Sequence, residues 1–230
     1  MITATHLAAE VHLVLGRARR TRLGVWALAL LAATTALAIH AGIADPGRTA
    51  ARLGLLVALM GAGFCAASEA DRAALDLARA HPVTAFALAV GRWTALALLA
   101  AAVASLHVAL LGAAGVIRLG AVPAGVAAGI GAAAAAAGAG LCAAWLGGNG
   151  LVGGLLAYVV LVSGLSPDVW VVLVRPGVLR AAGAAVLEFL PGLWRYRELA
   201  AGDVGAWLHA GAWVGGGVAL AAWLLAGRRR

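Results

Sequence analysis

The sequence contains no lysine, since all 17 of its basic residues are arginine. A nucleotide-binding P-loop needs a lysine directly after its glycines to reach the phosphates, so the 230 residues of this sequence contain no P-loop of that type. Cysteine is almost as scarce. Cys65 and Cys142 both lie within apolar runs, where we expect them to be buried as small apolar side chains, because a zinc site needs more ligands at closer spacing.

Charged residues are also few, at 11% of the chain, against about 25% in soluble domains. Apolar residues make up 64% and the mean hydropathy is +0.99. These values exclude an ordinary water-soluble monomer, and the long apolar runs predict an all-α polytopic membrane protein. The net charge of +8 then reflects orientation in the membrane better than binding to nucleic acid.

The apolar runs predict one transmembrane domain over residues 1–230 with six spans. The expected spans are 23–43, 53–67, 84–113, 121–146, 151–166 and 205–227. An even number of spans places both ends of the chain on one side of the membrane. Both ends carry arginine clusters, which predict that this side is the cytoplasm.

Residues 1–22 are expected to form a helix that lies at the cytoplasmic membrane surface. Leu7, Val11, Val14 and Ala18 share one face at helical spacing, and the segment ends in several arginines. An amphipathic helix of this kind binds at the interface. The alternative, a cleaved signal peptide, is disfavoured because the charged leader is long and further apolar spans follow it.

The most unusual segment is a charged insert between the second and third spans, "SEADRAALDLARAHPVTAFALAVGRW". Ser68 and Asp71 fit a helix cap, the pairs Arg72/Asp76 and Asp76/Arg79 have ion-pair spacing, and Pro82 ends the pattern. The spacing predicts a self-contained helix over 68–82. This helix is either a solvated loop without a role or a docking surface on the cytoplasmic side.

The insert resembles the corresponding segment of the permease subunits of ABC-2 type transporters. The resemblance rests on the acidic Glu69 at the end of span two, a short charged helix, "HPVT" and the basic "GRW" that opens span three. The sequence departs from the family pattern where "AALDL" replaces a Gly-Thr-Leu-Glu-like stretch, where His81 replaces leucine before Pro82, and where Arg92 replaces lysine.

The resemblance implies an exporter subunit in a bacterial inner membrane that pairs with a second permease subunit, identical or paralogous. A separate ABC ATPase would bind ATP and magnesium, so this chain would need no cofactor, metal or catalytic residue of its own. The residues implied to couple to that ATPase are Glu69, Asp71, Arg72, Asp76 and Arg79. The resemblance further implies that residues 167–204 form short re-entrant helices on the outer side.

Two alternatives remain open at this stage: a heme-exporter-type permease of cytochrome c maturation, which has the same plan and a similar length, and a membrane scaffold or assembly protein without transport activity. An intramembrane enzyme is disfavoured, since the spans show no paired acids, histidine cluster or Ser–His constellation. A secondary carrier is disfavoured because no acidic residue lies within a span. We expect His40 and His107 to be helix-end or hydrogen-bonded residues.

Three further patterns carry weaker expectations. Glycine pairs at four-residue spacing predict close helix packing. We expect the eight tryptophans to anchor span ends at the membrane surfaces, and Asp168 and Glu188 to pair with Arg175 or Arg180 on the outer side. The glycine pairs are Gly125/Gly129, Gly150/Gly154 and Gly211/Gly215.

Overall fold

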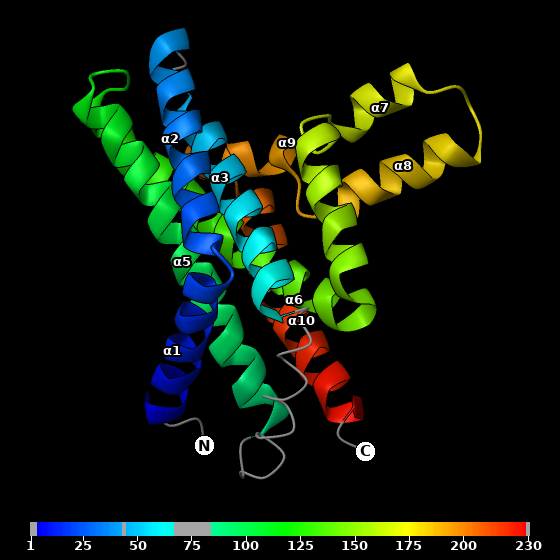
Figure 1. Ribbon diagram of the computed structural model, residues 1–230. Helices are drawn as coiled ribbons and strands as arrows, with labels where there is room; N and C mark the ends of the chain where they lie inside the picture. The colour runs from blue at the N-terminus through cyan, green and yellow to red at the C-terminus, as the bar shows by residue number, and fades with distance from the viewer. Residues whose placement is uncertain (1–3, 43–44, 67–83, 229–230) are drawn as a thin grey trace.

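The computed structural model describes residues 4–42, 45–66 and 84–228, and the regular elements in these ranges are all helical (Figure 1). The long helices are α1 (Ala4–Arg20), α2 (Leu23–Ala41), α3 (Pro46–Gly61), α5 (Ala85–Ala113), α6 (Val122–Leu161) and α10 (Val204–Arg228). Shorter elements are the π-helical turn η1 (Ala62–Ala66), η2 (Leu119–Ala121), α7 (Pro167–Leu173), α8 (Val178–Phe189), α9 (Leu193–Tyr196) and η3 (Arg197–Ala201).

Short polar residues fix where several helices begin. The side chain of Asp45 accepts a hydrogen bond from the Arg48 N–H at 2.9 Å, with Pro46 in the first helical position of α3. Thr84 accepts from the Ala87 N–H at 3.1 Å at the start of α5, and Asp203 accepts from the Ala206 N–H at 2.6 Å at the start of α10. Each cap satisfies a donor that a helix N-terminus leaves unpaired.

The centre of the molecule is the first half of α6, which packs against α3, α5 and α10. Its alanine and glycine residues from 131 to 144 are almost all buried. A Cβ added at Gly217 of α10 would lie 2.9 Å from the Cα of Gly138, so the two backbones touch at this crossing. Small residues permit such approach in membrane proteins, where packing drives helix association.

Four helices are long and apolar enough to cross a membrane: Leu23–Ala41, Ala85–Ala113, Leu119–Leu161 and Val204–Gly227. Three of them correspond to the expected spans 23–43, 84–113 and 205–227, and Leu119–Leu161 contains the expected span 121–146 and most of 151–166. The expected span at 53–67 corresponds to α3 and η1, where α3 alone has 16 residues and begins with charged turns. The expected span at 151–166 is the second arm of α6, which ends at Leu161.

A sharp kink divides α6 at Gly148, within the sequence "GGNG" that separates the expected spans 121–146 and 151–166. Gly148 has φ 61° and ψ −149°, a combination that only glycine adopts readily. The first arm descends toward the kink and the second arm returns beside it (Figure 1). In Figure 1 both α1 and α2 run upward, and from α2 onward α3, α5, the two arms of α6 and α10 alternate in direction. The described ends near Ala4 and Arg228 both lie at the lower end of the picture.

Helix α1 packs mainly on α5 and turns sharply into α2 at Thr21 and Arg22. Val14 and Ala18 are buried in the core and Val11 packs against it, as expected for the apolar face of this helix. Leu7 lies among the side chains that the structure does not describe. Arg22 has φ 59° and is the non-glycine residue with positive φ in the described part of the chain.

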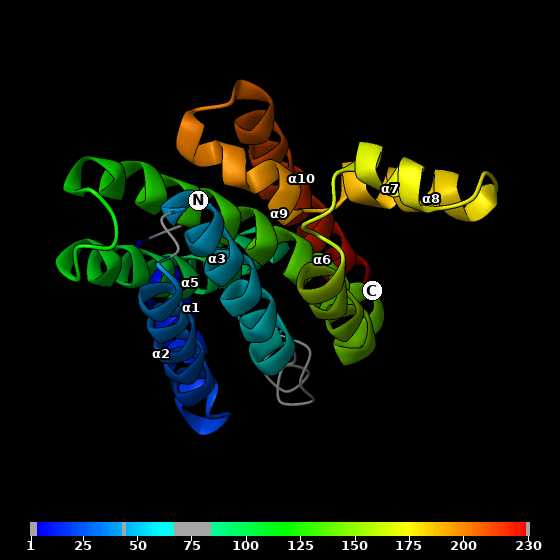
Figure 2. The ribbon, with the colours of Figure 1, turned by 90° about the horizontal axis from the view of Figure 1, so that it is seen from above.

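Helices α7 and α8 form a hairpin that projects from the other helices, as both views show (Figures 1 and 2). The two helices contact each other far more than any other element. The Trp170 indole N–H donates to the Arg180 carbonyl at 3.1 Å, and its ring packs on Gly183, where a Cβ would clash with it. Several apolar side chains of the hairpin remain exposed, among them Val172 at 84% and Val178 at 87%.

Candidate functional site

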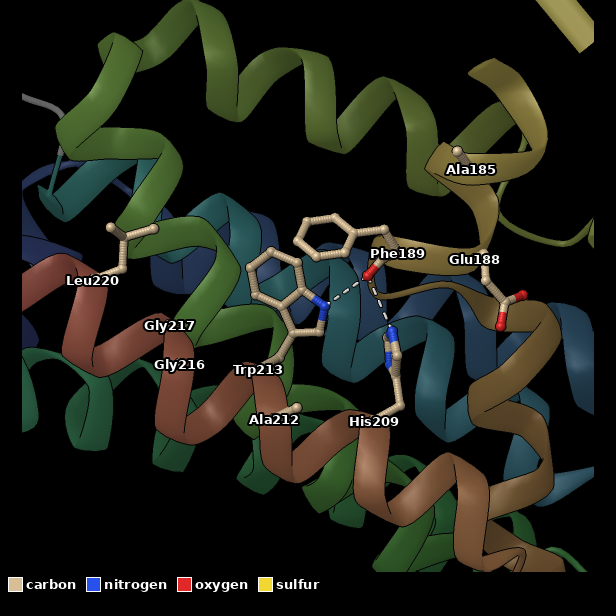
Figure 3. Close-up of a pocket in the computed structure, with 9 residues that line it drawn as sticks. All are labelled: Ala185, Glu188, Phe189, His209, Ala212, Trp213, Gly216, Gly217 and Leu220. Carbon is tan, nitrogen blue, oxygen red and sulfur yellow. Dashed lines mark hydrogen bonds between the residues drawn. The ribbon is translucent and has the colours of Figure 1, made fainter. Parts of the chain in front are cut away.

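An apolar cavity of about 640 Å³ lies between the end of α8 and the middle of α10 (Figure 3). Phe189 and Trp213 form its aromatic wall, with ring centroids 5.2 Å apart in an edge-to-face arrangement. Ala212, Gly216, Gly217 and Leu220 of α10 and Ala185 of α8 line the rest, and Glu188 and His209 supply the polar groups. A cavity of this size fits a small ligand.

Side chains from the following segment bind the carbonyl groups at the end of α8. Trp194 donates to the Leu187 oxygen at 2.9 Å, and Arg195 donates to the Glu188 oxygen at 3.2 Å. The Phe189 oxygen accepts two bonds, from His209 at 3.0 Å and from Trp213 at 2.8 Å. The last carbonyls of a helix lack partners within the helix, so these side chains fix the position of α8 above the cavity.

The hydrogen bonds of His209 define its tautomer in this network. The Phe189 carbonyl can only accept, so the proton lies on Nε2, and Nδ1 accepts from the Tyr196 hydroxyl at 3.1 Å. Burial raises the pKa of the Tyr196 phenol well above its ordinary value, because the charged form is poorly solvated there. Tyr196 therefore stays protonated and serves as the donor.

The polar side chains beside the cavity bind other groups of the protein, so the surface that a ligand would meet is mainly apolar. Glu188 forms an ion pair with Arg195, whose guanidinium also lies 4.6 Å from the ring centre of Trp194. Among the described residues, no group of three or more histidine, cysteine, aspartate or glutamate side chains is placed to hold a metal ion. The arrangement is therefore suited to holding an apolar or amphipathic molecule.

The residues predicted to couple to an ATPase, Glu69, Asp71, Arg72, Asp76 and Arg79, lie outside the described residues, as does the expected helix at 68–82. Arg92, from the same resemblance, is described. Its side chain is 2% exposed, and the guanidinium carbon lies 5.7 Å from the ring centre of Trp145 in α6. Arg92 thus links α5 to α6 through a cation–π contact.

The expected pairing of Glu188 with Arg175 or Arg180 is wrong, because Glu188 pairs with Arg195 instead. The reason is local. Glu188 lies in the last turn of α8, and the chain reverses at Pro191 and Gly192 to return α9 beside it. Arg175 precedes α8 at the distant tip of the hairpin, and Arg180 lies in the first turn of α8, about 12 Å along the helix from Glu188.

Sequence reasoning missed His209, Trp213 and Phe189 as members of one site. His209 and Trp213 have i,i+4 spacing on α10, which places both on one helix face and could have marked them as a pair. Their common partner is a backbone carbonyl of α8, which no side-chain pattern reveals. The sequence predicted that the tryptophans anchor the ends of the spans, but it did not predict that four of them also form hydrogen bonds within the protein. The indole N–H groups of these four donate to backbone carbonyls of other segments: Trp93, Trp170, Trp194 and Trp213.

No protein-family model, curated protein or solved structure matches this chain.

Proposed function

We propose that this protein is the membrane-spanning permease subunit of an ATP-binding-cassette exporter, with six spans and both ends in the cytoplasm of a bacterial cell. In this proposal α3 with η1, and the second arm of α6, complete the six spans. A separate ATPase subunit hydrolyses ATP, and a second permease subunit, identical or paralogous, completes the pathway. The substrate is an apolar or amphipathic molecule.

The observation that supports the proposal most directly is the placement of the ends that flank the charged insert. η1 ends at Ala66 and α5 begins at Ala85, and both lie in the lower half of Figure 1, with the start of α1 and the end of α10. These are also the arginine-rich ends of the chain. Arginine accumulates on the cytoplasmic side of membrane proteins, where an ATPase would be accessible to the insert.

The cavity between α8 and α10 supports the choice of substrate. Its lining is apolar, and Phe189, whose side chain is 68% exposed, lies at its edge. A molecule that entered from the surrounding bilayer would meet apolar surface and few polar groups. This chemistry suits lipid-like or hydrophobic molecules better than ions or sugars.

Co-purification of the tagged chain from native membranes in mild detergent tests the proposed partner. We expect a protein with a nucleotide-binding P-loop to co-purify, and the double charge reversal Asp76→Arg with Arg79→Glu to release it. Arg48→Glu, at the opposite end of the molecule, is the control and should retain the partner. Recovery of the chain without any ATPase would contradict the proposal and favour a membrane scaffold.

Substrate-stimulated ATP hydrolysis tests the cavity separately. Ala212 lines the cavity, whereas its neighbour Gly211 is exposed outside it. Ala212→Trp should abolish stimulation by hydrophobic compounds while leaving basal hydrolysis intact, and Gly211→Trp should preserve both. Equal stimulation in the two variants would show that the substrate binds elsewhere.

A further inference from the structure

A second cavity lies on the opposite side of α6, where the α1–α2 junction meets the kink. Its volume is about 370 Å³. The walls are mostly apolar, with Met60 and Phe64 on one side and Val152 and Leu156 of the second α6 arm on the other. Thr21 and Asn149 are the polar residues that line it, so the cavity has both an apolar interior and a polar edge.

The polar edge lies next to a cluster of positive charge. Thr21 is flanked in the chain by Arg20 and Arg22, and Arg19 precedes them; all three arginine side chains are exposed. The ion pairs formed between described residues, Arg195–Glu188 and Arg197–Glu198, belong to the segment before α10 and neutralise none of these arginines. The edge of the cavity therefore attracts anions.

The backbone holds this cluster in an unusual conformation. Thr21 closes the end of α1, since its N–H and its hydroxyl both donate to the Arg17 carbonyl at 2.8 Å. Arg22 then adopts φ 59°, a left-handed conformation that is uncommon for residues other than glycine. Strained backbone is often retained where it positions a functional side chain. Here it turns the chain so that Thr21 faces the cavity between two arginines.

We infer that this junction is a binding site for one anionic phospholipid, with the headgroup phosphate on Arg20 and Arg22 and an acyl chain in the cavity. The apolar walls match a hydrocarbon chain, and exposed arginines beside a cavity between membrane helices are the feature that binds anionic headgroups. Asn149, exposed at the cavity edge, can donate to an ester carbonyl. A bound lipid would join α1, η1 and the second arm of α6.

Thermal unfolding of the purified chain in neutral detergent, titrated with lipid, tests the site. Phosphatidylglycerol should raise the melting temperature saturably, and phosphatidylcholine with the same acyl chains should not. The double variant Arg20→Gln with Arg22→Gln should weaken the apparent affinity by about 30-fold, and higher salt should weaken it in the unmodified chain. Arg48→Gln with Arg52→Gln, at the opposite end, is the charge control.

Two neighbouring glycines provide a matched test of the acyl-chain site. Gly153 lines the cavity, whereas Gly154 does not, and an added Cβ would meet nothing within 4 Å at either position. Gly153→Leu should therefore remove the response to phosphatidylglycerol, and Gly154→Leu should retain it. This pair remains informative even if the arginine variant fails to fold.

The inference is overturned if phosphatidylcholine stabilises equally, if the arginine variant binds as the unmodified chain does, or if the two leucine variants respond alike. Inorganic phosphate is the remaining probe. Stabilisation by phosphate alone that equals the effect of phosphatidylglycerol would identify a site for free anions and would also overturn the inference.

Discussion

The first half of α6 and the α7–α8 hairpin are both apolar, but they are held in the structure in different ways. Around Gly138, small side chains let the backbones of α6 and α10 touch, and nearly every residue is buried. In the hairpin, larger apolar side chains such as Val172 and Val178 remain exposed, and hydrogen bonds at the end of α8 hold it in place. One region is stabilised by packing and the other by a few directional contacts.

The two regions therefore differ in how much a change of shape would cost. Sliding α6 against α10 would break close packing over the whole crossing, because packed cores deform poorly. Tilting the hairpin would break the hydrogen bonds to three carbonyls, the Glu188–Arg195 ion pair and the contact between the Phe189 and Trp213 rings. Since the cavity lies beneath the end of α8, its volume depends on the part of the molecule that is easiest to move.

Substitutions at the α6–α10 crossing should change the stability of the protein most. Gly138→Ala would place a methyl group against the Trp213 backbone carbonyl, and should destabilise the protein by about 1–3 kcal/mol through overpacking. Gly211→Ala, on the open face of α10, should instead stabilise by about 0.5–1 kcal/mol, because alanine favours the helix. Denaturation with increasing SDS in mixed micelles would measure both, and the same sign for both would contradict the packing argument.

The next prediction concerns the contact between α2 and α5. Thr35 forms a buried hydrogen bond of 2.8 Å with Nδ1 of His107, which confirms the expectation of a hydrogen-bonded histidine. Thr35→Val should cost about 1–3 kcal/mol, because it leaves the buried ring nitrogen unpaired. Adding His107→Leu should recover most of this loss, since both polar partners are then removed.

Thr34 provides the control for that experiment, because its hydroxyl donates to the Leu30 carbonyl of its own helix at 2.6 Å. Thr34→Val should leave the melting temperature within about a degree of the unmodified protein. A loss equal to that of Thr35→Val would mean that the α2–α5 hydrogen bond contributes nothing specific.

A smaller effect should appear only in the hairpin. Trp213→Phe keeps an aromatic wall but removes the donor to the Phe189 carbonyl, at a cost of about 1 kcal/mol. Hydrogen exchange should accelerate in α8 and remain unchanged in the first half of α6. Trp223→Phe, at a 71% exposed position on the same helix, should change neither, and uniform acceleration would show that the two regions are not independent.

The smallest effect is expected at alkaline pH. Because the folded state holds the Tyr196 proton more tightly than the unfolded chain does, the stability from this group is complete below pH 10 and falls as the pH rises above it. Melting temperatures between pH 8 and 11 should therefore fall less steeply for Tyr196→Phe than for the unmodified protein. Parallel curves would show that the phenol does not contribute.

The apolar runs predicted the long helices well, because the length of an apolar run and the residues that cap a helix are local properties of the sequence. The second arm of α6 was placed correctly as a separate apolar segment, but its joining to the first arm through Gly148 was not. The "GGNG" sequence separates the two apolar runs, but nothing local shows that Gly148 bends one continuous helix instead of joining two separate ones.

The glycine pairs show why close helix packing could not be predicted from residue spacing alone. Gly125 and Gly129 pack closely against Pro46, Val108 and Ala104, as predicted. The prediction was wrong for Gly150/Gly154 and for Gly211/Gly215, since an added Cβ there would meet nothing within 4 Å. All three pairs have the same spacing, and only the three-dimensional arrangement decides which pair faces a neighbouring helix.

The kink at Gly148 has a consequence for the surrounding bilayer. The arm from 149 to 161 is about 20 Å long at 1.5 Å per residue, whereas the hydrocarbon layer is about 30 Å thick. In the proposed six-span arrangement, a membrane that matches the full length of α5 is too thick for this arm, so either the lipids beside it would thin or the α7–α8 hairpin would lie below the level of the headgroups. In both cases, the proposed arrangement would bring lipid tails on that flank to the mouth of the cavity beneath α8.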